Sequence, residues 1–415
     1  MSDERIELEL TAMAHGGSAL GRHGRQTVFV PYTIPGERIE ARIIEDRGRV
    51  AFAEGVRLLD VSVDRVYPVC KHFGAGKCGR CHWQHIAYDA QLLLKQDVLA
   101  DQLERVGGFQ DFEVLPAIPS PLEWGYNDHM TMVAGENGVP GFLSTDGQRV
   151  IVIDECHIIH PDLLALYESL DLQFDGLRRL RLQRGSDGHM MLILTMADDQ
   201  APELETDMPA SVNMLLADNE PVNLIGESHS RYEVGGRVFR VTAGSDFRAN
   251  VAQLPNLIEA VLHTLELTGS EAVLDLYAGV GLFSAFIAPH AGLVTLVESY
   301  PPAVTDAEEN LAEFEHIDLI EGAVEDVLPE LDEAYDAALL DPPSDGLSTA
   351  ALDQIAARNI PRLVYISSDP ATLARDCKRL AAQGYQLVTV QPVDFAPQTY
   401  YIDAIAVLKR VVHRY

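Results

Sequence analysis

The glycine-containing turn at residues 275–281 (DLYAGVG) is the feature that most constrains the fold of this chain. It follows the apolar run 272–274 and leads into the helix-like segment 282–287. Glycine at a strand-to-helix turn lets backbone approach a ligand, and an acidic residue one strand further on, here Glu298, is placed to bind ribose hydroxyls. The turn lacks the third glycine of a pyrophosphate-binding turn, so a nucleoside cofactor without a diphosphate, such as S-adenosylmethionine, fits better than NAD.

Around this turn, residues 231–415 alternate strand-like and helix-like segments. The buried strands are predicted at 273–276, 293–297, 337–340 and 363–366. Such alternation gives a mostly parallel sheet with helices on both faces, and ligands bind at the carboxyl ends of its strands. The polar residues at those predicted ends are Asp275, Glu298, Asp341, Ser367 and Ser368. The sequence therefore predicts that these residues converge on one site.

The N-terminal 60 residues favour a small β-barrel. Strand-like runs at 6–10, 27–30 and 38–44 are separated by glycine turns, a pattern typical of short barrel strands. Barrels of this kind often bind oligonucleotides, and a purely structural appendage is nearly as compatible with the pattern. Both interpretations stay open at this point.

Residues 61–230 indicate a mixed α+β region. A helix is predicted over 90–106, with an apolar stripe made of Leu92, Leu93, Val98, Leu99 and Leu103. Residues 178–195 predict a hairpin that turns at 185–188, and residues 198–221, acidic and with three prolines, predict a surface connection. The hairpin carries the densest basic cluster of the chain, a candidate RNA contact or a solvated strand face: Arg178, Arg179, Arg181 and Arg184.

Composition indicates a multidomain globular protein of the cytoplasm. The chain has 415 residues, of which 47% are hydrophobic, and no apolar run is long enough for a membrane span. A net charge of −32 opposes binding to nucleic acid, because Lys and Arg drive phosphate binding. Any RNA-binding face must be local and arginine-based, since lysine occurs only at Lys71, Lys77, Lys95, Lys378 and Lys409.

Four of the five cysteines predict a metal site: Cys70, Cys78, Cys81 and Cys156. Their spacing suits tetrahedral zinc and a [4Fe-4S] cluster about equally. A disulfide is disfavoured in a cytosolic chain, and the fourth thiolate argues against a radical-type cluster with an open iron. Cys377, within a helical segment, is most simply a small buried residue.

The motifs together resemble the bacterial RNA uracil-5-methyltransferases, which make 5-methyluridine in transfer and ribosomal RNA. The resemblance covers nearly the whole chain: a TRAM-like barrel, the cluster motif at 78–85, the cofactor loop at 275–284, and the segments 341–343 and 364–376. It implies a Rossmann-like methyltransferase domain (231–415), an OB-like TRAM barrel (1–60) and a central iron–sulfur domain (61–230), in a cytoplasmic monomer that binds rRNA or tRNA and no membrane. It also implies S-adenosylmethionine bound by Arg248, Asp275, Tyr277, Gly279, Gly281, Glu298 and Asp341, and a [4Fe-4S] cluster rather than zinc on the four cysteines.

Several positions depart from this family where the chemistry is expected. The resemblance aligns Ser368 with the cysteine that adds to uracil, and Asp403 with a glutamate that removes the C5 proton. Arg248 stands where the family usually has a glutamine, Ser344 where it has an arginine, and Asp369 where it has an asparagine. A hydroxyl needs an adjacent base to become a nucleophile, and Asp341 and Asp369 are weak candidates for that role.

Three hypotheses follow. The first is an RNA methyltransferase, with the family's reaction or one that methylates a more reactive atom while Asp341 accepts the proton. The second is a noncatalytic RNA- or cofactor-binding paralogue, and the third makes Ser368 the nucleophile. The predicted catalytic residues are Ser368, Asp403 and Asp341.

Overall fold

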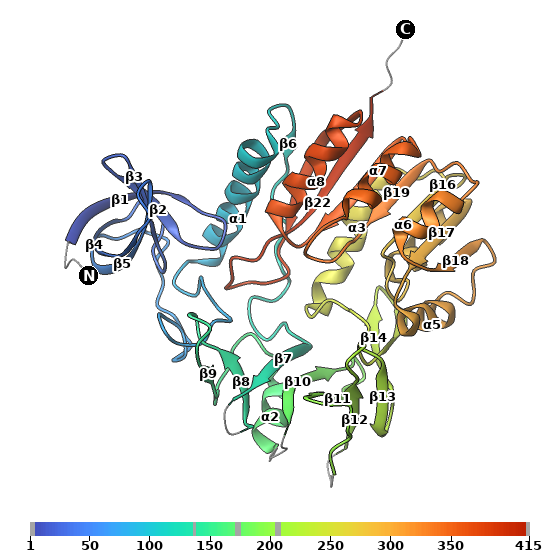
Figure 1. Ribbon diagram of the computed structural model, residues 1–415, viewed down its shortest axis with the longest axis horizontal. Helices are drawn as coiled ribbons and strands as arrows, with labels where there is room; N and C mark the ends of the chain where they lie inside the picture. Colours follow the sequence, from blue (N-terminus) through green and yellow to red (C-terminus); the bar gives the residue numbers. More distant parts are fainter. Residues whose placement is uncertain (1–4, 136–137, 171–175, 204–208, 412–415) are drawn as a thin grey trace.

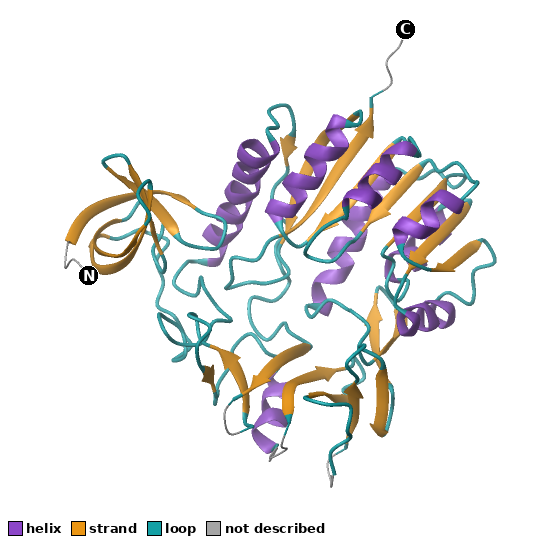
Figure 2. Ribbon diagram, viewed as in Figure 1, coloured by secondary structure: helices purple, strands orange, loops and turns teal. Residues whose placement is uncertain are grey.

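The computed structural model describes residues 5–135, 138–170, 176–203 and 209–411. Figure 1 shows three parts: an N-terminal barrel, a central sheet, and a C-terminal sheet covered by helices. Loops from all three parts meet in the middle of the molecule (Figure 2).

The N-terminal part is a closed five-stranded barrel, as the glycine-separated strands predicted. Its strands follow the order β1-β2-β3-β5-β4, with bounds β1 (Arg5–Met13), β2 (Ala19–His23), β3 (Gln26–Val30), β4 (Arg38–Asp46) and β5 (Val50–Asp60). Alternate residues of β1 are buried, as expected of a strand with one face in a barrel interior. Trp83, from outside the barrel, closes its core and is fully buried.

The central part is a seven-stranded sheet of order β13-β12-β11-β10-β7-β8-β9. Its elements are β7 (His129–Ala134), β8 (Pro140–Leu143), β9 (Val150–Ile151), α2 (Pro161–Ser169), β10 (Leu177–Arg184), β11 (Met190–Met196), β12 (Ala210–Leu215) and β13 (Pro221–Ile225). The predicted hairpin is confirmed, because β10 pairs antiparallel with β11. A two-stranded ribbon follows, made of β14 (His229–Val234) and β15 (Arg237–Thr242).

The C-terminal part is an eight-stranded sheet of order β18-β17-β16-β19-β20-β22-β21-β6. The four predicted strands are confirmed as β16 (Ala272–Leu276), β17 (Leu293–Glu298), β19 (Ala337–Leu340) and β20 (Arg362–Ser367), all parallel. The remaining strands are β6 (Glu113–Val114), β18 (Ile317–Glu321), β21 (Tyr385–Val393) and β22 (Asp403–Arg410). Because β22 runs antiparallel to β20, its first residues lie beside the carboxyl end of β20.

Helices cover both faces of this sheet, since alternate strand residues belong to two separate apolar cores. One core contains α3 (Leu254–Leu265), α4 (Leu282–Ile287) and α5 (Pro301–Asn310). The other contains residues of α1 (Tyr88–Gln102), α6 (Val324–Val327), α7 (Thr349–Ala357) and α8 (Pro370–Ala382). The chain also forms a short π-helix, η1 (Leu103–Gly107), and three 3-10 helices, η2 (Val251–Gln253), η3 (Ala288–His290) and η4 (Leu328–Glu330).

Two details of the sequence prediction are wrong. Leu93, assigned to the apolar stripe of the 90–106 helix, is 63% exposed, whereas Lys95 on the same helix is buried. Lys95 is buried because its Nζ donates to Asp394 Oδ1 at 2.6 Å, an ion pair that fastens α1 to the C-terminal part. The predicted surface connection at 198–221 contains β12, a buried strand parallel to β11; residues 204–208 of this segment lie outside the described residues.

Within the described residues, no helix is both long and apolar enough to cross a membrane. The predicted domain boundaries at 60 and 230 stay predictions. β6, inside the range predicted for the central domain, pairs with β21 of the C-terminal sheet.

Candidate functional site

A cavity of about 640 Å³ opens at the carboxyl ends of the parallel strands, within the size range of small-molecule sites. We call it the strand-end cavity. The predicted residues that line it are Tyr277, Gly279, Glu298, Arg248, Asp341, Ser368 and Asp403. Parallel β17, β16, β19 and β20 are neighbours in that order, so residues at their carboxyl ends meet at one edge of the sheet. Of the five residues predicted to converge, Glu298, Asp341 and Ser368 line this cavity, whereas Asp275 and Ser367 do not.

The turn after β16 forms one wall of this cavity. Tyr277 has a positive φ of 62°, and Gly279 and Gly281 have φ values of 56° and 79°, so three residues adopt left-handed backbone conformations. A Cβ on Gly281 would lie 2.7 Å from Leu311 Cδ1, whereas one on Gly279 would meet nothing within 4 Å. Gly281 thus permits packing against the protein, and Gly279 leaves space open to the cavity.

Glu298 holds this turn in place. Its Oε2 accepts from Gly279 N at 2.8 Å, and its Oε1 accepts from Ser299 N and Tyr300 N at 2.7 and 2.8 Å. Each carboxylate oxygen can accept more than one hydrogen bond. Glu298 therefore keeps acceptor capacity for a ligand hydroxyl while it fixes the glycine turn.

Asp275 and Gly281 are not among the residues that line the cavity. Asp275 is fully buried and its Oδ2 accepts from Ser284 Oγ at 2.7 Å. Burial raises the pKa of Asp275 to about 7. Asp275 and Gly281 contact the protein around the turn and not the cavity. A direct contact between them and a cofactor stays a prediction.

Arg248 also lines this cavity and pairs with two carboxylates. Its Nη1 and Nη2 donate to Asp341 Oδ2 and Oδ1 at 2.7 and 2.9 Å, a bidentate pair, and its Nε lies 3.9 Å from Asp403 Oδ1. The guanidinium also lies over the Phe395 ring, 5.4 Å from its centroid. Both oxygens of Asp341 are therefore engaged by Arg248.

Asp403 is the second carboxylate beside Arg248. Its side chain is 13% exposed, and burial raises its pKa to about 6, against the lowering effect of nearby Arg248. A carboxylate with a pKa near the working pH accepts protons more effectively than one near 4. The Asp403 side chain is one methylene shorter than the glutamate with which the resemblance aligns it, and it still lines the cavity.

Ser368 lines the same cavity without an activating base. Among the described residues, no carboxylate or imidazole bonds its hydroxyl. Asp369, one candidate base, instead caps α8 by accepting from Thr372 N at 2.7 Å, and the hydrogen bond from His15 lowers the pKa of Asp369. Cys377 does not replace the missing thiol, because it is fully buried in the core on α8, as predicted.

The four predicted metal ligands line a separate small cavity, which we call the thiol cavity: Cys70, Cys78, Cys81 and Cys156. Phe73 and Ile153 form part of its wall. Burial raises the pKa of all four thiols, that of Cys156 to about 11. Within the described ranges, no three His, Cys, Asp or Glu side chains surround a single ion position.

The sequence did not identify two further residues of the strand-end cavity, His129 and Asp246. His129 is the first residue of β7, and its ring Nε2 donates to Phe247 O at 2.6 Å. No motif surrounds His129, so only the tertiary fold could reveal its position. Asp246, two residues before Arg248, lies in the loop after β15.

The hairpin arginines do not form one basic surface. Arg178 and Arg179 are exposed, whereas Arg184 Nε pairs with Asp162 at 3.0 Å. The Nε of Arg181 is buried and has no hydrogen-bond partner among the described residues. RNA contact by Arg178 and Arg179 stays a prediction.

Comparison with known proteins places this geometry in a family. The TRAM domain family matches residues 3–56. The chain is 31% identical to an uncharacterized RNA methyltransferase of Synechocystis sp., over 98% of this chain and 96% of the relative. It is 32% identical to another from Streptomyces avermitilis, over 98% of both chains.

A solved structure shares the whole fold. The Pyrococcus abyssi tRNA (uracil-54, C5)-methyltransferase in complex with S-adenosyl-L-homocysteine superposes with a TM-score of 0.72 at 22% identity, covering 97% of this chain and 100% of that chain. The fold class is thereby confirmed as a barrel joined to a Rossmann-like methyltransferase. With identities above 30% along nearly its full length, the chain belongs to the family of RNA methyltransferases that these relatives represent.

Proposed function

We propose that this protein transfers a methyl group from S-adenosylmethionine to a base or ribose of ribosomal or transfer RNA. The observation that carries the proposal is the strand-end cavity, which joins the glycine turn and Glu298 to Arg248, Asp341 and Asp403. Glu298 and the 277–280 turn would hold the cofactor, whose sulfonium supplies an electrophilic methyl group. The relatives named RNA methyltransferase support the assignment of substrate class.

We further propose that Asp403 accepts the substrate proton. A nitrogen or hydroxyl oxygen of the RNA takes the methyl group, the electron pair of the broken sulfur–carbon bond stays on sulfur, and the acceptor's proton passes to the Asp403 carboxylate. Arg248 fixes Asp341 and lowers the pKa of Asp403. This chemistry needs alignment and a base and no covalent attachment of the RNA to the enzyme.

Ser368 is not required by this chemistry, and its substitution gives a first prediction. We expect Ser368→Ala to retain methyl transfer within about threefold of the unaltered protein, because no base activates the hydroxyl. The measurement is the initial rate of label transfer to RNA. Near-complete loss in Ser368→Ala, together with retained or higher activity in Ser368→Cys, would show instead that residue 368 is the nucleophile.

The proposal as a whole is tested with tritium-labelled S-adenosylmethionine and RNA from cells that lack the gene. Label should appear in RNA in proportion to enzyme and time. If the protein binds the cofactor but labels neither rRNA nor tRNA, the noncatalytic paralogue is correct. Two observations favour that alternative. Ser368 is exposed at the position of the family's cysteine, and both carboxylate oxygens of Asp341 already accept hydrogen bonds from Arg248.

We propose that the thiol cavity holds a [4Fe-4S] cluster. Four thiols line one partly apolar cavity, and four cysteine thiolates are the ligand set of such a cluster. Bound iron would replace the protons of the buried thiols and tie the 70–81 segment to Cys156.

Cysteine substitution tests this second proposal. The protein purified without oxygen should contain about four iron and four sulfide per chain, and Cys156→Ala should lose most of both. Cys377→Ala is the matched control, because Cys377 is buried in a different core, and it should keep the full iron content. Stoichiometric zinc, or equal iron in Cys156→Ala and the unaltered protein, would contradict the cluster.

A further inference from the structure

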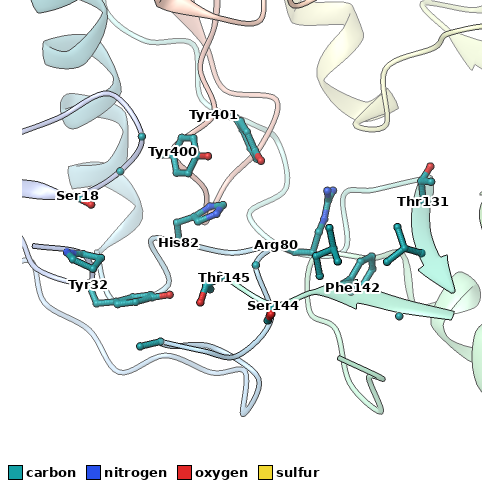
Figure 3. A pocket seen from close by; sticks show the side chains of 18 residues that line it. Ser18, Tyr32, Arg80, His82, Thr131, Phe142, Ser144, Thr145, Tyr400 and Tyr401 are labelled. Atoms are coloured by element: carbon teal, nitrogen blue, oxygen red, sulfur yellow. The ribbon is translucent and has the colours of Figure 1, made fainter. Parts of the chain in front are cut away.

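A second cavity of about 570 Å³ lies where the three parts of the molecule meet, and we call it the junction cavity (Figure 3). Segments far apart in the sequence supply its walls. They are the barrel loops at 16–18 and 31–32, residues of the segment 75–82, strand β7, residues 141–145 at β8, and the loop that precedes β22. The proposed chemistry of the strand-end cavity uses none of its residues.

Aromatic rings gather at one side of the junction cavity. The ring centroids of His82 and Tyr400 are 4.3 Å apart, those of Tyr400 and Tyr401 are 4.7 Å apart, and those of His82 and Tyr401 are 5.8 Å apart. Figure 3 shows the two tyrosines descending toward His82 from the same loop. Tyr401 is 44% exposed, so part of its ring is free to stack on a ligand.

The close fit of this aromatic group to the barrel depends on Gly17. Gly17 has a φ of +83°, and a Cβ there would lie 2.7 Å from Tyr400 Cδ1. Its carbonyl accepts from Trp83 Nε1 at 3.1 Å. Gly17 thus joins the barrel to Trp83 and to the loop that carries Tyr400 and Tyr401. The rings are therefore held in position by the protein itself.

The charge of the junction cavity is opposite to that of the protein. Among the described residues that line it, Arg80 is the one Lys or Arg and there is no Asp or Glu. Arg80 lines both the junction cavity and the thiol cavity. Its Nε is buried with no hydrogen-bond partner in the described chain, and its guanidinium lies 5.6 Å from the Phe142 centroid, on the side of the junction cavity that Phe142 lines. In a chain of net charge −32, this combination of an unpaired arginine and stacked rings suits a phosphate joined to a base.

The two cavities are neighbours along two segments of chain. His129 lines the strand-end cavity, and Thr131 and Val133 on the same face of β7 line the junction cavity. Tyr401 precedes Asp403 by two residues, which span at most about 7 Å. The two cavities therefore lie close to each other along β7 and along the loop before β22.

We propose that the junction cavity binds an unpaired nucleotide beside the methylated one, with its base stacked on Tyr401 and its phosphate on Arg80. This inference rests on the proposed RNA methyltransferase function. It adds that the substrate is single-stranded or opened at the target, because a base must leave its stack to lie against the Tyr401 ring.

The test compares Tyr401→Ala with Tyr401→Phe, which keeps the ring. The probe is a short fluorescein-labelled single-stranded RNA of mixed sequence, and its binding is followed by anisotropy. We expect roughly tenfold weaker binding for Tyr401→Ala and less than twofold change for Tyr401→Phe. Tyr67→Ala is the matched control, because Tyr67 is 93% exposed and is not among the residues that line the cavity; its binding should be unchanged.

A second measurement uses the unaltered protein alone, so it does not depend on how a variant folds. The same RNA containing 2-aminopurine should lose fluorescence on binding, as a stacked base does, and unchanged fluorescence on binding would contradict stacking. Equal RNA affinity of Tyr401→Ala and the unaltered protein, or equal affinity for the matching duplex, would overturn the proposal.

Failure of this inference is distinguishable from failure of the proposed function. Binding of labelled S-adenosylmethionine, measured by equilibrium dialysis, should be the same for Tyr401→Ala and the unaltered protein. Tyr401-dependent RNA binding without methyl transfer would refute the enzyme and keep the nucleotide site. Methyl transfer at an equal rate in Tyr401→Ala and the unaltered protein would keep the enzyme and refute the nucleotide site.

Discussion

Asp403→Asn should lower the rate of methyl transfer by about 10²- to 10⁴-fold, the range expected when a general base is removed. The amide is the same size as the carboxylate but cannot accept a proton under these conditions. In the unaltered protein the rate should rise as the pH increases through about 6, because the pKa of Asp403 is raised to about 6 by burial and the base must be ionised. Asp403→Asn should lose this dependence. The measurement is the single-turnover rate of label transfer at a series of pH values.

Asp369→Asn is the matched control for this change. Asp369 follows Ser368 directly, yet its carboxylate caps α8 through Thr372 N, and asparagine caps helices equally well. Methyl transfer by Asp369→Asn should stay near that of the unaltered protein. If Asp403→Asn keeps its rate, or if the two variants lose activity to the same extent, Asp403 is not the proton acceptor.

Arg248→Gln should both destabilise the protein and move its pH profile. Arg248 forms a bidentate pair with Asp341, and the two side chains are only 20% and 17% exposed. Removing it leaves Asp341 and Asp403 close together without a counterion, and such a loss typically costs roughly 3 kcal/mol of the free energy of unfolding. Arg248 lowers the pKa of Asp403, so without it that pKa rises further. The rising limb of the pH–rate profile should then move to higher pH.

Arg42→Gln provides the comparison for stability. Arg42 pairs with Glu54 at 2.7 Å, but the two side chains are 48% and 51% exposed, so the expected loss is below about 1 kcal/mol. Urea unfolding at pH 7 measures both variants. Equal stability of Arg248→Gln and Arg42→Gln, with the pH limb unmoved, would mean that the Arg248–Asp341 pair has neither effect.

The parts of the fold that depend on local pattern could be predicted from the sequence. The four parallel strands, the glycine turn and the barrel each carry their own periodicity or turn residues, and parallel strands necessarily bring their carboxyl ends to one edge. This is why Glu298, Asp341 and Ser368 were expected together and are found around one cavity. The cysteines were likewise grouped by spacing and line one cavity.

Features that depend on distant pairing could not be predicted in the same way. Arg248 and Asp341 are 93 positions apart, and nothing near either residue indicates that they form a bidentate pair. Lys95 is buried through Asp394, almost 300 positions away, so helical periodicity misassigned the helix face that contains Leu93. The junction cavity is lined by segments from the barrel, the cysteine-containing loop, the central sheet and the loop before β22, and only the fold brings Arg80 and Tyr401 to one cavity.

The most direct test of the central claim is mass spectrometry of nucleosides from rRNA and tRNA of cells with and without the gene. The claim is that one cavity aligns S-adenosylmethionine with an RNA nitrogen or hydroxyl and uses Asp403 as the base. One methylated nucleoside, carrying its methyl group on nitrogen or oxygen, should disappear on deletion, return with the unaltered gene or with Ser368→Ala, and stay absent with Asp403→Asn. No lost nucleoside, or a loss restored by Asp403→Asn, would contradict the account.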